Sequence, residues 1–223
     1  MTHVIIGANR GIGLEIVRQL RTRGDTVVAT CRQTHPDLDA TGAEIVEDVD
    51  VTRHETLRAL ERHLQGRSVD WLMVVAGVMR IQRLGELDAG AVDDIRLQFE
   101  SNALGPLMAV EALAPLLDDG GKIGIVTSRM GSIADNTSGN SYGYRMSKAA
   151  VNMAGVSLAE DLRPRGISVA LLHPGYVRTD MTSHNGHIDA DESARGLIAR
   201  MDELDLQRTG RFWHAVSGDQ LPW

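Results

Sequence analysis

A tyrosine and a lysine four residues apart, Tyr144 and Lys148, have the types and spacing that proton transfer needs. Residues four apart on a helix share one face, so the ammonium would lie beside the phenol and favour its ionised form. A tyrosine placed in this way can exchange a proton near neutral pH. An ordinary pair on a helix surface has the same spacing and remains an alternative. The other two tyrosines, Tyr142 and Tyr176, have no such partner.

A glycine-rich turn near the start of the chain suits phosphate binding. Gly7, Gly11 and Gly13 follow the apolar run His3 to Ile6 and open the helical pattern Gly11 to Arg23. Small residues let the backbone approach a pyrophosphate, and a helix N-terminus supplies free N–H groups. The turn therefore predicts a dinucleotide site, although a tight turn without a ligand can have the same composition.

Two arginines suit the adenosine end of such a site. Arg32 follows the apolar run Thr26 to Thr30, where an acid often accepts from the ribose 2′-hydroxyl, and no acid stands there. Arg32 and Arg10 could pair with a 2′-phosphate, which favours NADP over NAD, unless both only point into solvent. Asp50 is a candidate acceptor for the adenine amino group, and Asp50 or Asp48 could equally be an acid at a helix N-terminus.

Short apolar runs alternate with helical patterns along the chain. The expected strands are His3 to Ile6, Thr26 to Thr30, Glu44 to Val46, Trp71 to Val75, Lys122 to Thr127 and Ile167 to Leu172, with a last short strand, Arg211 to Ala215, at one edge. The expected helices are Gly11 to Arg23, Arg53 to Gln65, Ala91 to Leu117, Tyr144 to Arg163 and Asp191 to Glu203. This alternation predicts an α/β fold with a doubly wound parallel sheet, the Rossmann arrangement.

Composition narrows the class of protein. The 223 residues suit one domain, 1–223, and 43% hydrophobic content is typical of a soluble globular protein. A net charge of −7 argues against a nucleic-acid partner, and no apolar run is long enough to cross a membrane. The first residues already read as a strand, which leaves no room for a signal peptide, and Cys31 is the single cysteine. We therefore expect a cytoplasmic protein.

In order and type, these motifs resemble the classical short-chain dehydrogenases/reductases over nearly the whole chain. The resemblance rests on the glycine turn, residues 75–77, Asn102, residues 127–128, the pair Tyr144 and Lys148, and residues 174–179. Segment 131–138 and the ending with Phe212 and Trp213 are most similar to the small carbonyl reductases related to the C-signal protein.

The resemblance implies four catalytic residues. Tyr144 would be the general acid in carbonyl reduction and the base in alcohol oxidation. Lys148 would also hydrogen-bond the nicotinamide ribose, and Asn102 would hold a water that links Lys148 to solvent. Ser128 would orient the substrate oxygen and stabilise developing negative charge. A structural asparagine and a serine that only caps the backbone remain the alternatives for Asn102 and Ser128.

The choice of serine is less direct than the other assignments, because the interval from Ser128 to Tyr144 is longer than in the commonest family members. The rival serines in this interval are Ser132, Ser138 and Ser141. Ser128 is preferred because its strand would aim it at the carboxyl edge of the sheet, where ligands bind in open α/β folds.

The implied cofactor is NADP(H). Its expected binding residues are Gly7, Asn9, Arg10, Gly11, Ile12, Gly13, Arg32, Asp50, Val51, Ala76, Gly77, Tyr144, Lys148, Pro174, Gly175, Val177 and Thr179. Ile6 and Val75 depart from the family, which usually has threonine and asparagine there, and an apolar contact could replace the lost hydrogen bond. A short substrate lid is expected at about 180–190. His184 and His187 lie in it without a third ligand, so no metal site is expected.

The sequence therefore predicts an NADP(H)-dependent oxidoreductase acting on a small-molecule carbonyl or secondary alcohol. A nucleotide-binding signalling or sensor protein is the alternative, and a sugar-nucleotide epimerase is disfavoured because the chain has no length for an added substrate domain. In the family, helices such as Ala91 to Leu117 and Tyr144 to Arg163 pair across a two-fold axis. We therefore expect a homodimer, or a homotetramer built from it.

Overall fold

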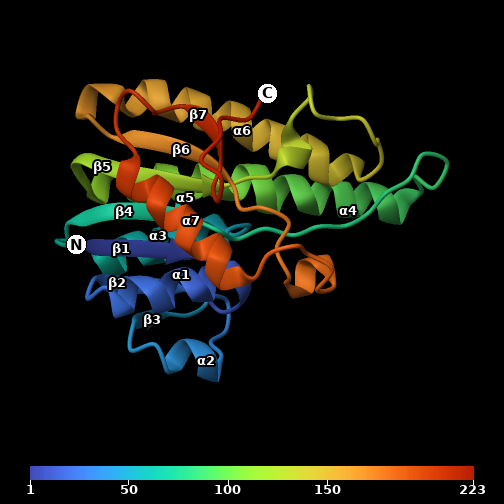
Figure 1. Ribbon diagram of the computed structural model, residues 1–223. Coiled ribbons are helices and arrows are strands. Elements are labelled where there is room, and N and C mark those ends of the chain that lie inside the picture. The colour runs from blue at the N-terminus through green and yellow to red at the C-terminus, as the bar shows by residue number, and fades with distance from the viewer.

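A computed structural model describes all residues 1–223. Seven parallel strands form one sheet in the order β3-β2-β1-β4-β5-β6-β7 (Figure 1). The strands are β1 (Thr2–Ile6), β2 (Thr26–Thr30), β3 (Glu44–Val46), β4 (Val69–Val74), β5 (Leu117–Val126), β6 (Ser168–His173) and β7 (Arg211–His214). The strand order reverses direction between β1 and β4, which is the doubly wound topology that the sequence predicts.

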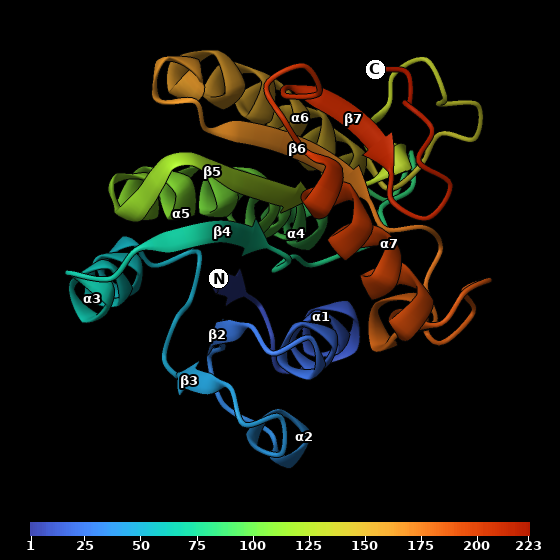
Figure 2. The ribbon, with the colours of Figure 1, turned by 60° about the vertical axis from the view of Figure 1, so that its left-hand side comes forward.

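Helices cover both faces of the sheet. They are α1 (Gly11–Thr22), α2 (Pro36–Asp39), α3 (His54–Leu64), α4 (Ala89–Phe99), α5 (Gly105–Leu113), α6 (Tyr142–Leu162) and α7 (Ala190–Glu203). Figure 2 shows α1 and α7 together on one side of the sheet, with α3, α5 and α6 on the other. No helix is long and apolar enough to cross a membrane.

Two hydrophobic cores result, one on each face of the sheet. Val4 and Ile6 pack into the core under α3, α5 and α6, whereas Ile5 packs into the core under α1 and α7. Successive strand residues point to opposite faces, so an almost continuously apolar strand is needed to supply both cores. This pattern confirms the predicted single-domain Rossmann fold.

The helix expected from Ala91 to Leu117 is not one helix. A π-helical turn, Glu100–Leu104, separates α4 from α5, and a 3₁₀ turn, Ala114–Leu116, ends the segment. The chain enters the sheet at Leu117 rather than at Lys122, because β5 pairs with β4 on both sides of a register shift. The exposed residues 118–120 occupy that irregular part of the strand.

Other boundaries differ less. Helix α6 begins at Tyr142 rather than at Tyr144, and the short helix α2 was not predicted. Proline at the first position of α2 and the His35 ring, which accepts a hydrogen bond from Asp37 N, stabilise this single turn. The predicted edge strand at Arg211 is confirmed, and it runs parallel to β6.

Ile6 and Val75 do not replace the lost hydrogen bond by contacting each other. Ile6 packs into the core beneath α5, whereas Val75 packs into the core beneath α1. The two strands are joined instead by the Ile6 carbonyl, which accepts from Val75 N at 2.9 Å and from Ala76 N at 3.1 Å. Backbone hydrogen bonds therefore connect β1 to β4 without the polar side chains.

Candidate active site

A small cavity lies at the carboxyl edge of the sheet, where the predicted catalytic pair meets the predicted cofactor residues. Its lining is Ile12, Val75, Gly77, Val126, Thr127, Tyr144, Lys148, Pro174 and Met181. Five of these nine residues were predicted from the sequence: Ile12, Gly77, Tyr144, Lys148 and Pro174. Segments far apart in the chain therefore converge where ligands bind in this kind of fold.

The glycine turn has the geometry that a phosphate needs. Gly7 has φ of +90°, and a Cβ there would lie 2.7 Å from Ala76 N. A Cβ on Gly13 would overlap the Gly7 carbonyl. The first turn of α1 carries no acid, and the side chain of Arg10 does not cap it. The N–H groups at this helix start are thus available to an anion, so the residues present fit a dinucleotide pyrophosphate.

Arg10 and Arg32 differ in their surroundings. Arg10 Nη1 lies 2.8 Å from Asp180 Oδ2, which joins the glycine turn to the segment expected to form the lid. The Arg32 side chain is exposed and makes no hydrogen bond. Asn9 lies beside this end of the site, where its Nδ2 donates to Gln33 O at 3.3 Å. Arg32 is therefore free to meet a phosphate, whereas Arg10 would exchange one anionic partner for another.

Asp50 caps a turn rather than a helix. Its Oδ1 accepts from Thr52 N at 2.9 Å and from Thr52 Oγ1 at 2.8 Å, and the N-cap residue of α3 is Arg53. Burial raises the pKa of Asp50, but the bonds from Thr52 and the charges of Arg32 and Arg53 outweigh it, and the net pKa is lowered. Asp50 is thus an ionised acceptor close to Arg32, while Asp48 sits in the left-handed region with φ of 59°.

Tyr144 and Lys148 lie on the first turns of α6. Gln82, in the loop between β4 and α4, fixes this end of the helix: its Oε1 accepts from Gly143 N at 3.0 Å. Lys148 Nζ lies 5.8 Å from the centre of the Tyr144 ring and donates to Val126 O at 2.9 Å. The structure therefore places the ammonium beside the phenol on one helix face.

Burial dominates the electrostatics of this pair. It lowers the pKa of Lys148 from 10.5 to about 8. It also raises the pKa of Tyr144, while the hydrogen bond with Ser128 acts in the opposite direction. The net direction for Tyr144 is upward, which is opposite to the lowering predicted from the sequence. Desolvation of the phenolate explains the difference.

The structure distinguishes Ser128 from its rivals. Ser128 is buried, lies beside Tyr144, and its Oγ accepts from Met130 N at 3.1 Å. The other serines bond elsewhere: Ser132 Oγ accepts from Asp135 N, Ser138 Oγ accepts from Arg145, and Ser141 Oγ pairs with the Asn140 side chain. Ser128 is the serine of this interval that interacts with Tyr144.

Asn102 lies within the π-helical turn and is fully buried. Its Oδ1 accepts from Val78 N at 2.8 Å, and its Nδ2 donates to Val78 O at 2.8 Å and to Ser147 Oγ at 3.0 Å. A Cβ on Gly77 would lie 3.0 Å from Asn102 Oδ1 and 3.6 Å from Lys148 Nζ. The asparagine side chain thus fixes the backbone of the cavity wall next to Lys148.

The turn after β6 holds the remaining predicted residues. Gly175 has φ of +94°, and a Cβ there would lie 2.6 Å from Ile188 Cδ1. Val177 is buried and forms an isolated bridge with Ile188. A Cβ on Gly11 would lie 3.3 Å from Thr179 Cγ2, so this turn packs directly on the glycine turn. Val51 does not line the cavity and packs against Gly105.

Sequence reasoning missed four cavity residues, Val75, Val126, Thr127 and Met181. Val75 and Thr127 were placed in motifs of the family resemblance and Val126 only in an expected strand, although all three stand at the carboxyl ends of their strands. Met181 falls inside the predicted lid and belongs to its short 3₁₀ turn, Asp180–Thr182. Position at the carboxyl end of a strand was therefore a usable signal for Val75, Val126 and Thr127, but not for Met181.

The two lid histidines do not converge. His184 Nε2 lies 3.3 Å from Asp180 Oδ1, whereas the His187 ring packs edge-on against Tyr176 at 5.1 Å. No group of three metal-ligating side chains gathers anywhere in the chain.

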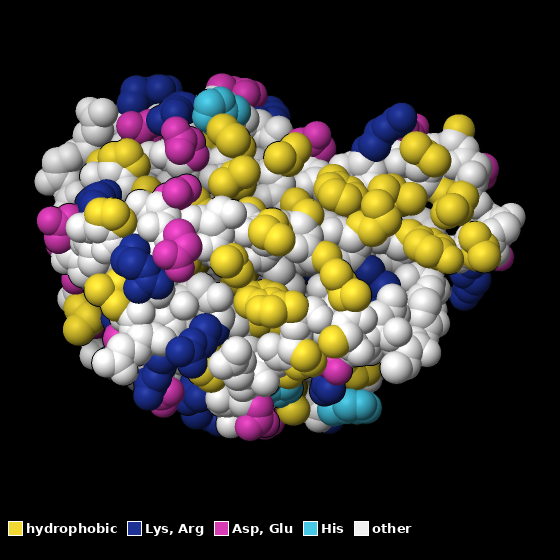
Figure 3. All heavy atoms as spheres, turned by 90° about the horizontal axis from the view of Figure 1, so that it is seen from above, with side chains coloured by type: hydrophobic (Ala, Val, Ile, Leu, Met, Phe, Trp, Pro, Cys, Tyr) yellow, Lys and Arg dark blue, Asp and Glu magenta, His cyan; other side chains and the backbone are white.

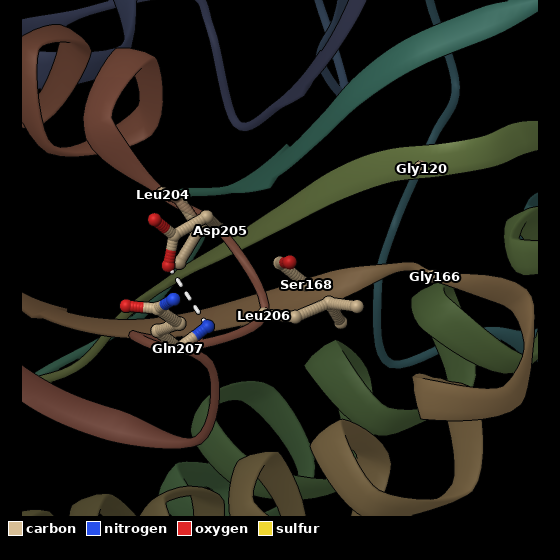
Figure 4. A pocket seen from close by; sticks show the side chains of 7 residues that line it. All are labelled: Gly120, Gly166, Ser168, Leu204, Asp205, Leu206 and Gln207. Atoms are coloured by element: carbon tan, nitrogen blue, oxygen red, sulfur yellow. Dashed lines mark hydrogen bonds between the residues drawn. The ribbon is translucent and has the colours of Figure 1, made fainter.

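A larger hollow lies at the opposite edge of the sheet (Figure 4). Its lining residues are Gly120, Gly166, Ser168, Leu204, Asp205, Leu206 and Gln207. Ser168 is the first residue of β6, so the hollow is at the amino ends of the strands. Asp205, its one charged group, accepts from the backbone of its own turn, Gln207 N and Arg208 N, each at 2.9 Å. This hollow has none of the chemistry of the first cavity.

One family model matches this chain, and several known proteins are similar to it. A family model described as short chain dehydrogenase matches residues 2–189. The 1-hydroxy-2-glutathionyl-2-methyl-3-butene dehydrogenase of Rhodococcus sp. (strain AD45) is 46% identical over 228 residues, 100% of this chain and 99% of that protein. The C-signal protein of Myxococcus xanthus is 42% identical over 170 residues, 75% of this chain and 100% of that protein. The NADPH-bound carbonyl reductase from chicken fatty liver has a TM-score of 0.89 at 27% identity, covering 100% of this chain and 98% of its own.

Proposed function

The chain belongs to the short-chain dehydrogenase family, and from that premise we propose that it is an NADP(H)-dependent oxidoreductase that moves hydride between the nicotinamide and a carbonyl or alcohol carbon. The observation that carries the proposal is the cavity in which Tyr144, Lys148, Gly77 and Pro174 face one another, with Ser128 against Tyr144.

Each residue of this set has a definite task in the proposed reaction. When bound, the nicotinamide supplies or accepts the hydride. In reduction, Tyr144 gives its phenolic proton to the carbonyl oxygen, and in oxidation it takes the proton from the alcohol. Ser128 donates a hydrogen bond to that oxygen and stabilises its developing charge. The Lys148 ammonium offsets the negative charge that is left on Tyr144 after the proton has moved.

Burial of Tyr144 and Lys148 favours the protonation states that carbonyl reduction needs. Because the pKa of Tyr144 is raised, the phenol holds its proton through neutral pH until the carbonyl oxygen accepts it. The Lys148 pKa of about 8 leaves most of the amine charged at pH 7. The acid and its charged neighbour are therefore both in the required state at neutral pH.

The preference for NADP over NAD rests on the adenosine end. Arg10 and Arg32 supply two cations there, and no acid replaces Arg32 at the end of β2 to accept from a ribose 2′-hydroxyl. The chicken relative was solved with NADPH, which supports the same choice.

The substrate class follows less directly. The Rhodococcus relative is named for an alcohol that bears a glutathionyl group, and the chicken relative is a carbonyl reductase. We propose that the substrates of this chain include alcohols or carbonyl compounds that carry a thioether with free carboxylates.

A signalling protein is the second candidate, because the Myxococcus relative is named C-signal. Such a protein could bind the nucleotide without turning over a substrate. The buried lysine argues for the enzyme, since a buried amine costs folding free energy and a pure nucleotide sensor has no need of a proton-transfer pair. We further propose the cytoplasm as the site of action, where the lone, unpaired Cys31 is stable.

Nucleotide binding tests the cofactor assignment. Fluorescence titration with NADPH and NADH should show tighter binding of NADPH to the wild type, because only NADPH presents a phosphate to Arg32. Arg32→Ala should weaken NADPH binding by about tenfold or more and leave NADH binding nearly unchanged. Equal affinities in the wild type would overturn the NADP preference, and no binding of either nucleotide would favour a protein that does not act as an oxidoreductase.

A further inference from the structure

The arginines around the cavity are mostly committed to holding loops in place. Arg145 donates to Gly139 O, Asn140 O, Met130 O and Ser138 Oγ, which fastens the loop between β5 and α6. Arg178 donates to Asp189 Oδ1 and His187 O within the lid segment. Arg10 bonds Asp180 through Nη1 alone, but it belongs to the proposed cofactor site. The guanidinium groups of Arg145 and Arg178 are already satisfied by the protein.

Arg129 differs from Arg145 and Arg178 because the protein holds it by one nitrogen only, and it lies outside the proposed cofactor residues. Its Nε donates to Asp135 Oδ2 at 2.6 Å, and neither Nη1 nor Nη2 has a hydrogen-bond partner. The side chain is 57% exposed. Anchoring through Nε restrains the plane of the guanidinium and leaves its two terminal nitrogens without a protein partner. A planar pair of N–H donors in this state matches the two oxygens of a carboxylate.

Two neighbours place Arg129 beside the reaction site. Ser128 precedes it in the chain and contacts Tyr144. His173 lies close enough to Arg129 for the charge of the guanidinium to lower its pKa. It is followed by Pro174, which lines the cavity. Arg129 therefore directly follows Ser128, in the 3₁₀ turn Arg129–Gly131 after β5, and lies near His173 at the end of β6.

The other titratable groups around Arg129 add no second positive charge. The His173 and His214 rings lie 5.0 Å apart, edge to face. Burial and, next, the charge of the other histidine and of Arg129 lower the pKa of His173 to about 3. Burial and then Arg129 also lower the pKa of His214, against the opposing effect of Asp219. Both imidazoles are therefore neutral at pH 7, and Arg129 is the cation of this wall, with Asp135 as its anchor.

We propose that Arg129 is a specificity-determining residue that receives a carboxylate of the substrate through Nη1 and Nη2, so that the enzyme prefers anionic carbonyl compounds and alcohols to neutral ones. The inference rests on the proposed function and deepens it: it assigns a residue to the charged part of the substrate. Asp135 acts through Arg129 and is a positioning residue. A charge-assisted bidentate contact of this kind typically contributes enough for a tenfold to hundredfold preference.

The test compares acids with their neutral esters. The probes are 4-carboxybenzaldehyde and 6-oxohexanoate, each paired with its methyl ester, with NADPH as reductant. The wild type should reduce the acids with a kcat/KM at least about tenfold higher than that of the esters, mainly through a lower KM. R129Q should bring the ratio of acid to ester close to one by raising the KM of the acids, and R129K should keep part of the preference.

R83Q is the matched control, because Arg83 is 68% exposed on the loop after β4 and its removal changes the net charge by the same amount. It should keep the wild-type ratio. Equal kcat/KM for acids and esters in the wild type would overturn the proposal. So would an R129Q variant that slows acids and esters alike, because that result indicates a structural role.

A binding measurement separates this inference from the proposed function. Calorimetry with monomethyl terephthalate and with its neutral amide, methyl 4-carbamoylbenzoate, needs no turnover. Tighter binding of the acid that R129Q abolishes would support the carboxylate site even if no carbonyl compound is reduced, in which case the proposed function alone fails. Equal binding of acid and amide would contradict the carboxylate site whatever the activity.

Discussion

Lys148 carries its charge where burial opposes it. The side chain is 3% exposed, and its one hydrogen bond is to Val126 O. The amine therefore costs folding free energy whenever it is protonated, and the proposed reaction explains why the chain keeps it. A lowered pKa of about 8 also means that the cost depends on pH.

This dependence predicts how Lys148→Met changes stability. Below pH 8 the folded wild type holds a buried charge, and the penalty fades as pH rises from the folded pKa of about 8 towards the unfolded value of 10.5. The melting temperature of the variant relative to wild type should therefore be higher at pH 7 than at pH 10, by roughly 4 to 8 °C for about 2 kcal/mol.

The other lysine supplies the control. Lys122 is less buried, and its Nζ donates to Met201 O and Asp202 O. Lys122→Met should show a smaller pH-dependent difference and retain turnover, whereas Lys148→Met should lose it. A melting difference for Lys148→Met that is the same at both pH values would contradict the lowered pKa.

At the scale of elements, the lid and the glycine turn are linked by one exposed ion pair. The Arg10 and Asp180 side chains are 69% and 59% exposed, so their attraction is weak and easily exchanged. A 2′-phosphate would draw Arg10 away from Asp180 and so release the start of the lid segment. The cofactor and the lid therefore compete for the same guanidinium.

Removing the competitor should favour the cofactor. Asp180→Asn is expected to tighten NADPH binding by about twofold to fivefold at low salt, with no change for NADH, and the gain should vanish at high salt. Asp189→Asn, which breaks the Arg178 pair of the same segment, is the matched control and should leave NADPH affinity as it is. Weaker NADPH binding by Asp180→Asn would refute the competition.

The elements also show how far the sequence can be read. Apolar runs that alternate with helical patterns predicted the parallel sheet, because a strand covered by helices on both faces needs apolar residues on both faces. The π-helical turn at Asn102 left no such pattern: it depends on the backbone of Val78, which is distant in sequence. The early start of β5 likewise depends on its pairing with Val69.

The sequence predicted the site to a similar degree. Tyr144, Lys148 and the glycine turn follow from local spacing, and the structure brings them together. The ion-pair partners of individual side chains could not be predicted from the sequence, because tertiary contacts determine them. Examples are Asp180 beside Arg10 and Asp135 beside Arg129. The direction of the Tyr144 pKa was predicted wrongly for the same reason, since burial is a property of the folded molecule.

At the scale of the whole molecule, hydrophobic side chains gather over the end that carries the loop after β4 and the start of α4 (Figure 3). Exposed apolar residues of these elements and of α6 are Ile81, Leu84, Leu87, Val92, Leu97, Met146 and Met153. Helices α4 and α6 pack side by side, so their outward faces form one surface. A surface of this kind favours the homodimer predicted from the sequence.

The dimer is testable by mass. Light scattering after size exclusion should give twice the 24.2 kDa chain mass for the wild type. Met153→Glu places a charge at a 69% exposed position of α6 and should shift the protein towards monomer, while Leu206→Glu, in the loop after α7 and outside this apolar surface, should not. A monomeric wild type would contradict the predicted assembly.

In the proposed reaction, Tyr144 passes a proton while hydride moves between the nicotinamide and the substrate carbon. The most direct measurement uses NADPH carrying deuterium at the transferred position, a panel of aldehydes that includes 4-carboxybenzaldehyde, and mass spectrometry of the alcohols. The wild type should yield alcohol one mass unit heavier, and Tyr144→Phe should bind NADPH as tightly but form at least about a hundredfold less product. Product formed equally by both proteins, or none from a wild type that binds NADPH, would contradict the proposed reaction.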